Sequence, residues 1–123
     1  MFRVIIAGTR DFTDYDLLKN YCDYMLSKKA ESGEEIVIIS GGASGADALG
    51  EQYAKERGYK ILRYPAQWKK YGRQAGPMRN REMADNADAL IAYWDGESRG
   101  TKNMIEEAKK RGLQVAVKNY KAC

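Results

Sequence analysis

Hydrophobic and polar residues alternate along the chain in blocks that predict strands and helices in turn. Residues Phe2–Ala7 form an almost continuous apolar run that ends at Gly8, which is typical of a strand buried on both faces. From about residue 14 to residue 29, apolar residues recur on one face of a helix, and Ser32-Gly33 ends this segment. The chain therefore begins with one strand followed by one helix.

The same alternation continues along the rest of the sequence. Further strands are predicted at residues 36–39, 59–64, 89–94 and 113–117, and further helices at residues 46–57, about 78–86 and 102–111. Apolar strands joined by helices imply a parallel sheet with helices on both faces. We therefore predict one α/β domain over residues 1–123, a Rossmann-like three-layer sandwich. Its five-stranded, mainly parallel sheet would have the strand order 3-2-1-4-5.

The composition agrees with a folded domain and narrows its class. Of the 123 residues, 44% are hydrophobic and 31% are charged, a balance typical of globular proteins. No apolar run approaches the roughly 18 residues that span a bilayer. The Phe2–Ala7 run is also too short for the core of a signal peptide. We therefore predict a cytoplasmic protein that has no membrane partner.

Residue counts exclude several kinds of chemistry. The sequence contains no histidine, so Ser-His and Cys-His nucleophiles and His-ligated metal sites are excluded. Its two cysteines, Cys22 and Cys123, predict neither a disulfide framework nor a zinc site, and we interpret Cys22 as a core residue. We expect no metal and no cofactor. Acid-base chemistry would come from carboxylates, Lys, Tyr or water.

One basic segment interrupts an otherwise mixed charge pattern. The net charge is only +4, too small to indicate a nucleic-acid-binding domain by itself. Five cations follow one another without an acidic residue, beside two aromatic rings: Lys69, Lys70, Arg73, Arg79 and Arg81, with Trp68 and Tyr71. Two interpretations are open. The segment is a solvated surface, or its rings stack on bases while its cations contact phosphates.

Glycine-rich loops follow the strands that would lie near the centre of the sheet. The loops after strands 1, 2 and 4 would open at the same carboxyl edge, where ligands bind in such folds. In the second loop, Gly41, Gly42 and Gly45 let backbone N–H groups approach an anion at a helix N-terminus. A phosphate would suit this place, and a tight turn without a ligand is the alternative. The spacing matches neither G-x-G-x-x-G nor G-x-x-x-x-G-K-[ST].

Other residues at the same edge have two interpretations each. Ser98 at the start of the last helix would bind a phosphate or form an ordinary N-cap. Arg10 would bind phosphate through two N–H groups or join a surface salt bridge. Asp47 would accept a hydrogen bond from a ribose hydroxyl or stabilise a helix N-terminus. Trp94 would stack on a base or pack in the core, and we favour the core.

Four segments, in this order, resemble the YpsA-related branch of the SLOG superfamily. They are Gly8-Thr9-Arg10, Ser40-Gly41-Gly42-Ala43-x-Gly45-Ala46-Asp47, Ala75-Gly76-Pro77-x-Arg79-Asn80-x-x-Met83 and Ser98-x-Gly100-Thr101. The resemblance covers nearly the whole chain and implies a Rossmann-like fold that binds a nucleotide-derived ligand. The ligand-binding residues would be Gly8, Thr9, Arg10, Gly41, Gly42, Ser44, Gly45, Asp47, Arg79, Asn80, Ser98, Gly100 and Thr101. Lys70 and Arg73 would lie on the rim. Related proteins often form dimers, so the resemblance also implies a homodimer.

The resemblance leaves the activity open. This chain is similar in fold to the LOG enzymes, which hydrolyse nucleoside monophosphates to base and ribose phosphate, and to DprA, which binds single-stranded DNA. LOG enzymes carry P-G-G-x-G-T-x-x-E, but here Gly96-Glu97-Ser98-Arg99 stands where that pattern has Pro-Gly-Gly-x, and Met104 stands at the glutamate position. We therefore predict a binding protein that senses or sequesters a phosphate-bearing nucleotide or nucleotide-derived small molecule.

Two other functions remain open. The first is hydrolysis of an N-glycosidic or phosphoester bond, for which Asp47, Glu106 and Glu107 are the candidate catalytic residues. The second is DprA-like binding of single-stranded nucleic acid by the basic, aromatic segment at residues 68–73.

Overall fold

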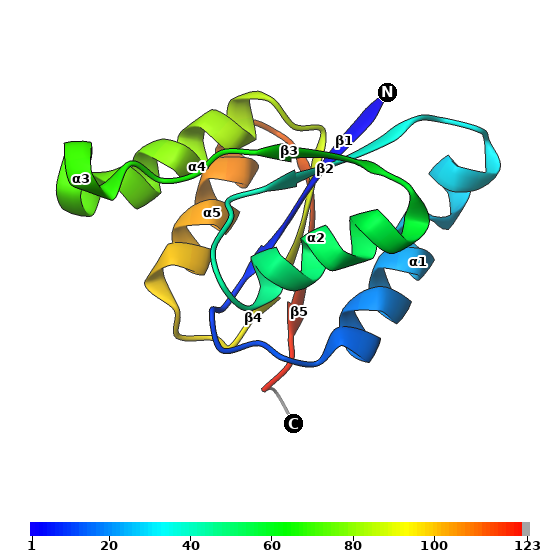
Figure 1. Ribbon diagram of the computed structural model, residues 1–123, viewed down its shortest axis with the longest axis horizontal. Coiled ribbons are helices and arrows are strands. Elements are labelled where there is room, and N and C mark those ends of the chain that lie inside the picture. The colour runs from blue at the N-terminus through cyan, green and yellow to red at the C-terminus, as the bar shows by residue number, and fades with distance from the viewer. Residues whose placement is uncertain (122–123) are drawn as a thin grey trace.

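The computed structural model describes residues 1–121 and consists of five strands and the helices that surround them (Figure 1). The strands are β1 (Phe2–Gly8), β2 (Ile36–Ser40), β3 (Lys60–Arg63), β4 (Ala89–Trp94) and β5 (Gln114–Asn119). The helices are α1 (Tyr15–Glu31), α2 (Ala46–Arg57), α3 (Trp68–Tyr71), α4 (Ala75–Asp85) and α5 (Arg99–Lys110), and a 3₁₀ turn η1 (Gly72–Gln74) joins α3 to α4.

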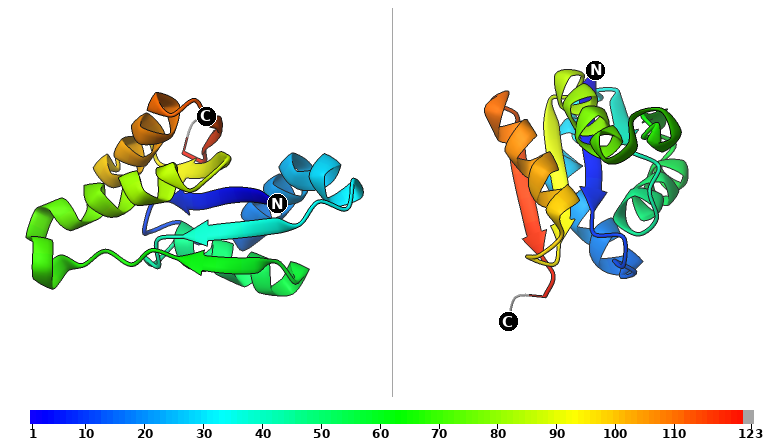
Figure 2. Two further views of the ribbon diagram at one scale, coloured as in Figure 1. Left: turned by 90° about the horizontal axis from the view of Figure 1, so that it is seen from above. Right: turned by 90° about the vertical axis from the view of Figure 1, so that its left-hand side faces the viewer.

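All strand pairs in the sheet are parallel, and the strand order is β3-β2-β1-β4-β5. This is the fold class and the strand order that the sequence predicts. Helices α1 and α2 cover one face of the sheet, and α4 and α5 cover the other (Figure 2). The carboxyl ends of β1 and β4 therefore lie side by side at one edge, with the loops that follow them.

Strand β1 fixes the centre of the core because its side chains alternate between the two layers. Val4 and Ile6 pack towards α1 and α2, whereas Ile5 and Ala7 pack towards α4 and α5. Helix α2 approaches β1 closely, since a Cβ atom at Gly50 would lie 2.7 Å from Cγ2 of Ile6. This contact holds the N-terminus of α2 close to the end of β1.

Element boundaries differ from the sequence predictions mainly at helix starts. The last helix begins at Arg99, not at residue 102, because Ser98 caps it and its Oγ accepts a hydrogen bond from the N–H of Thr101 (3.4 Å). Helix α4 begins at Ala75, three residues earlier than predicted. Pro77 is its third residue, where a missing N–H costs no intrahelical bond. Helix α3 and turn η1 lie in a segment predicted as a loop.

Cys22 is fully buried in the core, as predicted, with its Sγ 3.1 Å from Oη of Tyr93. Burial raises the pKa of its thiol to about 12. The other cysteine, Cys123, lies outside the described residues. None of the helices within residues 1–121 combines the length and the apolar character needed to cross a bilayer.

Candidate functional site

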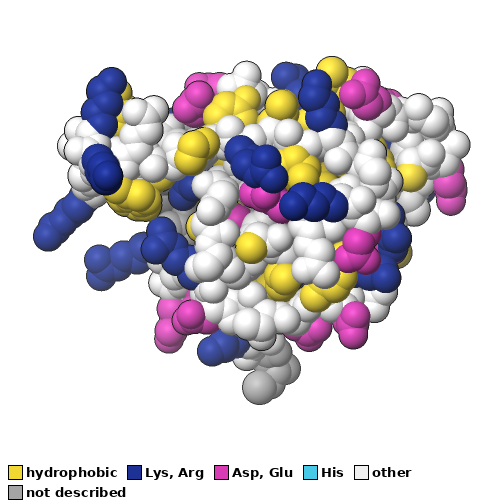
Figure 3. Space-filling model, viewed as in Figure 1, with side chains coloured by type: hydrophobic (Ala, Val, Ile, Leu, Met, Phe, Trp, Pro, Cys, Tyr) yellow, Lys and Arg dark blue, Asp and Glu magenta, His cyan; other side chains and the backbone are white. Residues whose placement is uncertain are grey.

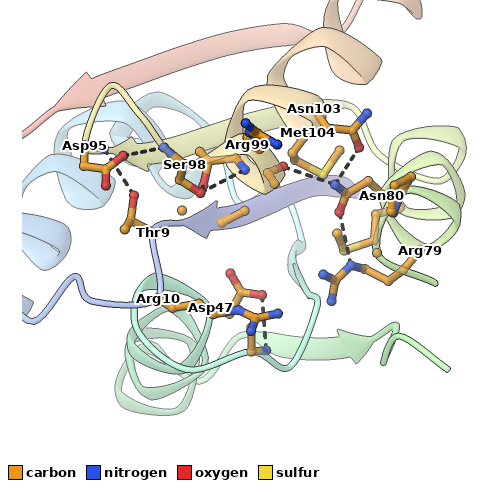
Figure 4. A pocket seen from close by; sticks show the side chains of 18 of the residues that line it. Thr9, Arg10, Asp47, Arg79, Asn80, Asp95, Ser98, Arg99, Asn103 and Met104 are labelled. Atoms are coloured by element: carbon orange, nitrogen blue, oxygen red, sulfur yellow. Dashed lines mark hydrogen bonds between the residues drawn. The ribbon is translucent and has the colours of Figure 1, made fainter. Parts of the chain in front are cut away.

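A cavity of about 570 Å³ opens at the carboxyl edge of the sheet, beside the ends of β1 and β4 (Figure 4). The loops after β1, β2 and β4 line it together with α3, α4 and the first turns of α5. Its lining residues are Ala7, Gly8, Thr9, Arg10, Asp11, Ala43, Asp47, Trp68, Gly76, Pro77, Arg79, Asn80, Met83, Asp95, Ser98, Arg99, Gly100, Thr101, Asn103 and Met104. The structure thus brings together residues from all four segments of the sequence motif.

The N-terminus of α5 forms one wall of this cavity. Asp95 holds the preceding loop, because its Oδ1 accepts hydrogen bonds from the N–H groups of Glu97 (2.9 Å) and Ser98 (2.8 Å). These two bonds lower the pKa of the Asp95 carboxyl. Gly100 is the second residue of the helix, where an N–H has no intrahelical acceptor. A Cβ atom at Gly100 would meet no atom within 4 Å, so no side chain of the protein covers this turn, and helix N-termini are common anion sites.

The glycine-rich loop after β2 uses several of its N–H groups within the protein. The N–H of Gly42 donates to Oγ of Ser40 (3.1 Å), and the N–H of Ala43 donates to Oδ2 of Asp47 (3.3 Å). The N–H of Ala46 donates to the carbonyl of Thr9 (3.3 Å). For the remaining N–H groups of this loop, phosphate binding stays a prediction.

Asp47 brings a buried carboxylate to the wall opposite α5. Its exposed fraction is 5%, and it belongs to the first turn of α2. Burial raises the pKa of this carboxyl, while the N–H groups of Ala43 and Gly8 and the charge of Arg79 act in the opposite direction. A carboxylate in this position repels a nearby phosphate, but it is a strong acceptor for a hydroxyl group.

Helix α4 contributes Arg79 and Asn80, which tie three walls of the cavity together. Arg79 donates from Nη1 to the carbonyl of Gly41 (2.7 Å) and from Nε to Oδ1 of Asn80 (3.1 Å). Asn80 in turn donates from Nδ2 to Oδ1 of Asn103 (2.8 Å) and to the carbonyl of Gly100 (3.3 Å). One buried amide thus fixes α4 against the start of α5. Figure 4 shows Arg79, Asn80 and Asn103 in sequence along this wall.

Trp68 of α3 closes the cavity on its outer side. Its ring packs against Gly76, where a Cβ atom would lie 3.2 Å from Cη2 of the indole. The guanidinium of Arg10 lies over the same ring, 5.9 Å from its centroid. Trp68 stays 48% exposed, so about half of its surface remains accessible to solvent.

A second cavity of about 280 Å³ adjoins the first. Its lining residues are Arg10, Gly41, Gly42, Ala43, Ser44, Pro65, Ala66, Trp68 and Arg79. Four of these residues, Arg10, Ala43, Trp68 and Arg79, also line the first cavity. Gly41, Gly42 and Ser44 therefore face this second space, apart from the larger one.

Some residues that the sequence singles out lie away from both cavities. Glu106 is exposed, and Glu107 forms an ion pair with Arg111 (2.7 Å between Oε1 and Nη1). Gly45 lines neither cavity and packs against the carbonyls of Thr9 and Arg10. Of the candidate catalytic residues, only Asp47 lines a cavity within the part of the chain that the structure describes.

Sequence reasoning missed Asn103, connected Trp68 only with the nucleic-acid alternative, and left Trp94 open. Asn103 lies about one helical turn after Arg99. This spacing places both residues on one face of the helix, and it could have identified Asn103 from the sequence. Trp68 appeared only as part of a basic segment, because nothing local places its ring against Gly76. Trp94 packs against the core on the α5 side, and its Nε1 donates to the carbonyl of Ser98 (3.1 Å), which agrees with the core interpretation.

Comparisons with known proteins agree with this description. The family model described as the YspA, cpYpsA-related SLOG family matches residues 2–71. The Gene 61 protein of Mycobacterium phage D29 is 32% identical to this chain over an alignment of 121 residues, and the match covers 94% of this chain and 94% of that protein.

Three solved structures share the fold. The protein TM1055 is 20% identical, with a TM-score of 0.66 over 94% of this chain and 72% of its own. DprA from Streptococcus pneumoniae is 20% identical, with a TM-score of 0.65 over 94% of this chain and 49% of its own. DprA from Helicobacter pylori, described with a single-stranded DNA binding mode, is 23% identical with a TM-score of 0.64, over 94% of this chain and 64% of its own. At these identities, the similarity shows a shared fold.

Proposed function

The chain belongs to the YspA, cpYpsA-related SLOG family, and on that premise we propose that its larger cavity binds a phosphate-bearing nucleotide or nucleotide-derived small molecule. One observation carries the proposal. An open helix N-terminus and a buried carboxylate face the same cavity from opposite walls, at Gly100 and Asp47. The first suits a phosphate and the second suits sugar hydroxyls. Their combination fits a nucleotide better than a simple anion.

The phosphate would lie at the first turn of α5. Gly100 leaves room for it, and the side chains of Arg10 and Arg99 line the same space. Each hydrogen bond to a charged group is worth about 1.5–3 kcal/mol, so a few such donors give useful affinity. The cavity volume of about 570 Å³ also lies within the usual range of small-molecule sites.

The sugar would lie nearer to Asp47, away from the phosphate. The carboxylate of Asp47 already accepts the N–H of Ala43, and it has further lone pairs for a ribose hydroxyl. Because Asp47 repels phosphate, it also favours one orientation of the ligand. We propose that this site serves to sense or sequester the ligand.

Hydrolysis is the second candidate function, and it rests on Asp47. A raised carboxyl pKa is the property expected of a general acid or base, and Asp47 has one inside the cavity. Asp95 is a poor proton donor, because its two backbone bonds favour the ionised form. Met104 lines the cavity at the position where the LOG pattern has glutamate, which favours binding over turnover.

Thermal unfolding with a ligand panel tests the proposal. The panel contains nucleoside mono-, di- and cyclic phosphates, NAD and ADP-ribose, and a ligand of the folded state raises the melting temperature. We expect a rise with at least one nucleotide, and no rise with the matching nucleoside. Chromatography of the same mixtures detects free base or phosphate. Product that disappears in Asp47→Asn would support the hydrolase instead.

Gly100→Asp provides a variant that opposes phosphate without damaging the fold. A carboxylate in the first turn of a helix is favourable by about 0.3–1 kcal/mol, and no atom lies within 4 Å of a Cβ atom at Gly100. The variant should therefore keep its stability and lose the nucleotide-dependent shift. Gly100→Asn is the matched neutral control and should retain most of it. Equal shifts in wild type and Gly100→Asp would place the phosphate elsewhere.

A further inference from the structure

The two adjoining cavities differ in charge. Three aspartates, Asp11, Asp47 and Asp95, line the larger one beside its cations. The smaller cavity is lined by the two arginines Arg10 and Arg79 and by no acidic residue. Figure 3 shows the wider setting, in which Lys and Arg side chains gather at the α3 end of the molecule. The smaller cavity therefore suits an anion throughout. The larger cavity suits an anion only at the wall that α5 forms.

Both guanidiniums have donors left for a ligand. Arg79 uses Nη1 and Nε for the carbonyl of Gly41 and for Asn80, and no hydrogen bond within residues 1–121 uses its Nη2. Arg10 lies over the ring of Trp68 with an exposed side chain. No carboxylate in the described part of the chain comes within ion-pair distance of either arginine. Two like charges within the described residues thus face one cavity, and neither is held in an ion pair.

Asp47 is the acidic group whose charge acts on Arg79. It lies beside Gly41, and its charge partly offsets that of Arg79. Its Oδ2 is engaged by the N–H of Ala43, and its carboxylate lines the larger cavity only. Burial lowers the pKa of Arg79, and the like charge of Arg10 adds a smaller effect in the same direction. A phosphate between the two guanidiniums would relieve this repulsion, since guanidinium matches phosphate geometry with paired N–H groups.

The boundary between the two cavities allows one molecule to occupy both. Trp68 lines each of them and stays partly exposed. Pro65 and Ala66 line the smaller cavity only, and Ala43, which lines both cavities, has a small side chain. A ligand whose sugar lies near Asp47 can therefore extend past Trp68 towards the two arginines.

We propose that the smaller cavity is a second phosphate subsite, and that the ligand is a nucleotide with two separated phosphate groups. A nucleoside 3′,5′-bisphosphate and a 5′-phosphorylated dinucleotide both have this chemistry. The inference rests on the proposed function, because the first phosphate and the sugar occupy the larger cavity.

Calorimetric titration with paired probes tests this assignment. The probes are the 5′-monophosphates and the 3′,5′-bisphosphates of adenosine and guanosine, together with the 5′-phosphorylated dinucleotides of both bases. One additional charge-assisted contact corresponds to at least about tenfold in affinity. We therefore expect a bisphosphate or a dinucleotide to bind at least about tenfold more tightly than the corresponding monophosphate.

Ala66→Glu isolates the second subsite, because Ala66 lines only the smaller cavity. This variant should remove the advantage of the second phosphate and leave monophosphate affinity within about twofold. Ala66→Gln has nearly the same size without the charge and should keep the advantage. Melting temperatures of both variants without ligand verify that they fold.

The outcomes separate the two proposals. If monophosphates bind to wild type and a second phosphate does not increase the affinity, the proposal of a second subsite is wrong and the proposed function stands. If no probe binds, both are wrong. Affinity that increases with each nucleotide of a longer single strand and falls steeply with salt would indicate nucleic acid, and would also overturn the inference.

Discussion

The guanidinium of Arg79 and the carboxylate of Asp47 converge beside Gly41. Arg79 reaches this point from α4 and donates to the carbonyl of Gly41, and Asp47 reaches it from the first turn of α2. A Cβ atom on Gly41 would lie 2.8 Å from Oδ2 of Asp47 and would overlap the Arg79 guanidinium. Close approach of these two side chains therefore requires glycine at this position.

Gly41→Ala should lower both stability and ligand affinity, because the methyl group must displace Arg79 or Asp47. Overpacking of this kind costs about 1–3 kcal/mol of unfolding free energy, which urea denaturation measures. Gly100→Ala is the control, since nothing lies within 4 Å of its Cβ position and alanine in a helix is favoured by up to about 1 kcal/mol. Equal stabilities for Gly41→Ala and wild type would show that the close approach is not maintained in solution.

Asp47→Asn should make the protein more stable at neutral pH. Burial raises the pKa of Asp47 in the folded state, so its ionised form opposes folding, whereas asparagine can still accept the N–H of Ala43. The gain should be absent below the ordinary pKa of aspartate, where the carboxyl is neutral in both states. It should grow as the pH rises through the raised pKa and then level off. Melting temperatures measured across this range test the prediction, and a gain independent of pH would contradict it.

Asn80→Ala should weaken the contact between α4 and α5. The buried amide accepts from Arg79 and donates to Asn103 and to the carbonyl of Gly100. Loss of these bonds should cost about 1–3 kcal/mol, and it should reduce nucleotide affinity because Gly100 belongs to the proposed phosphate site. Asn103→Ala is the milder comparison, since Asn103 is only partly buried. If both variants are equally stable, Asn80 is not the central link of this wall.

Asp23 of α1, which lines neither cavity, should contribute to the free energy of unfolding in a way that is lost at acidic pH. Its carboxylate accepts from Nε (3.0 Å) and Nη2 (2.6 Å) of Arg57 and from Oη of Tyr53 (2.7 Å), which joins α1 to α2. The bonds from Arg57 lower the pKa of Asp23, so their stabilisation is present above the ordinary aspartate pKa and is lost as the pH falls through the lowered value. Asp23→Asn should flatten this acid limb of the stability curve without changing nucleotide affinity. If the loss of stability at acidic pH is the same in Asp23→Asn and wild type, other titrating groups cause it.

Much of the fold follows from local sequence patterns. The strand of residues 2–8 is apolar on both faces because it lies between two helical layers, and its position at the centre follows from parallel βα topology. Helix α3 could not be predicted in this way, because four residues do not establish a helical period. A contact between residues distant in the sequence, Trp68 against Gly76, holds it in place.

The candidate site was predictable where strand ends determine it. Thr9 comes directly after β1, and Asp47 and Thr101 lie in the first turns of the helices that follow β2 and β4, so parallel topology brings them to one edge. Hydrogen bonding was not predictable in this way, as the N–H of Ala43 shows by donating to Asp47. The rotation of α5 about its axis also decides which of its side chains face the cavity. Met104 lines the cavity, whereas Glu107 bonds to Arg111.

A titration followed by ¹H–¹⁵N correlation spectra tests the central claim most directly, because it locates the bound nucleotide on the fold. With the nucleotide that raises the melting temperature most, the amide signals of Thr9, Asp47, Gly100 and Thr101 should shift together and saturate. Signals from the opposite edge of the sheet, such as those of Glu35 and Gln114, should stay unchanged. Saturable shifts confined to other surfaces, or no shift with any nucleotide of the panel, would contradict a nucleotide site at this edge.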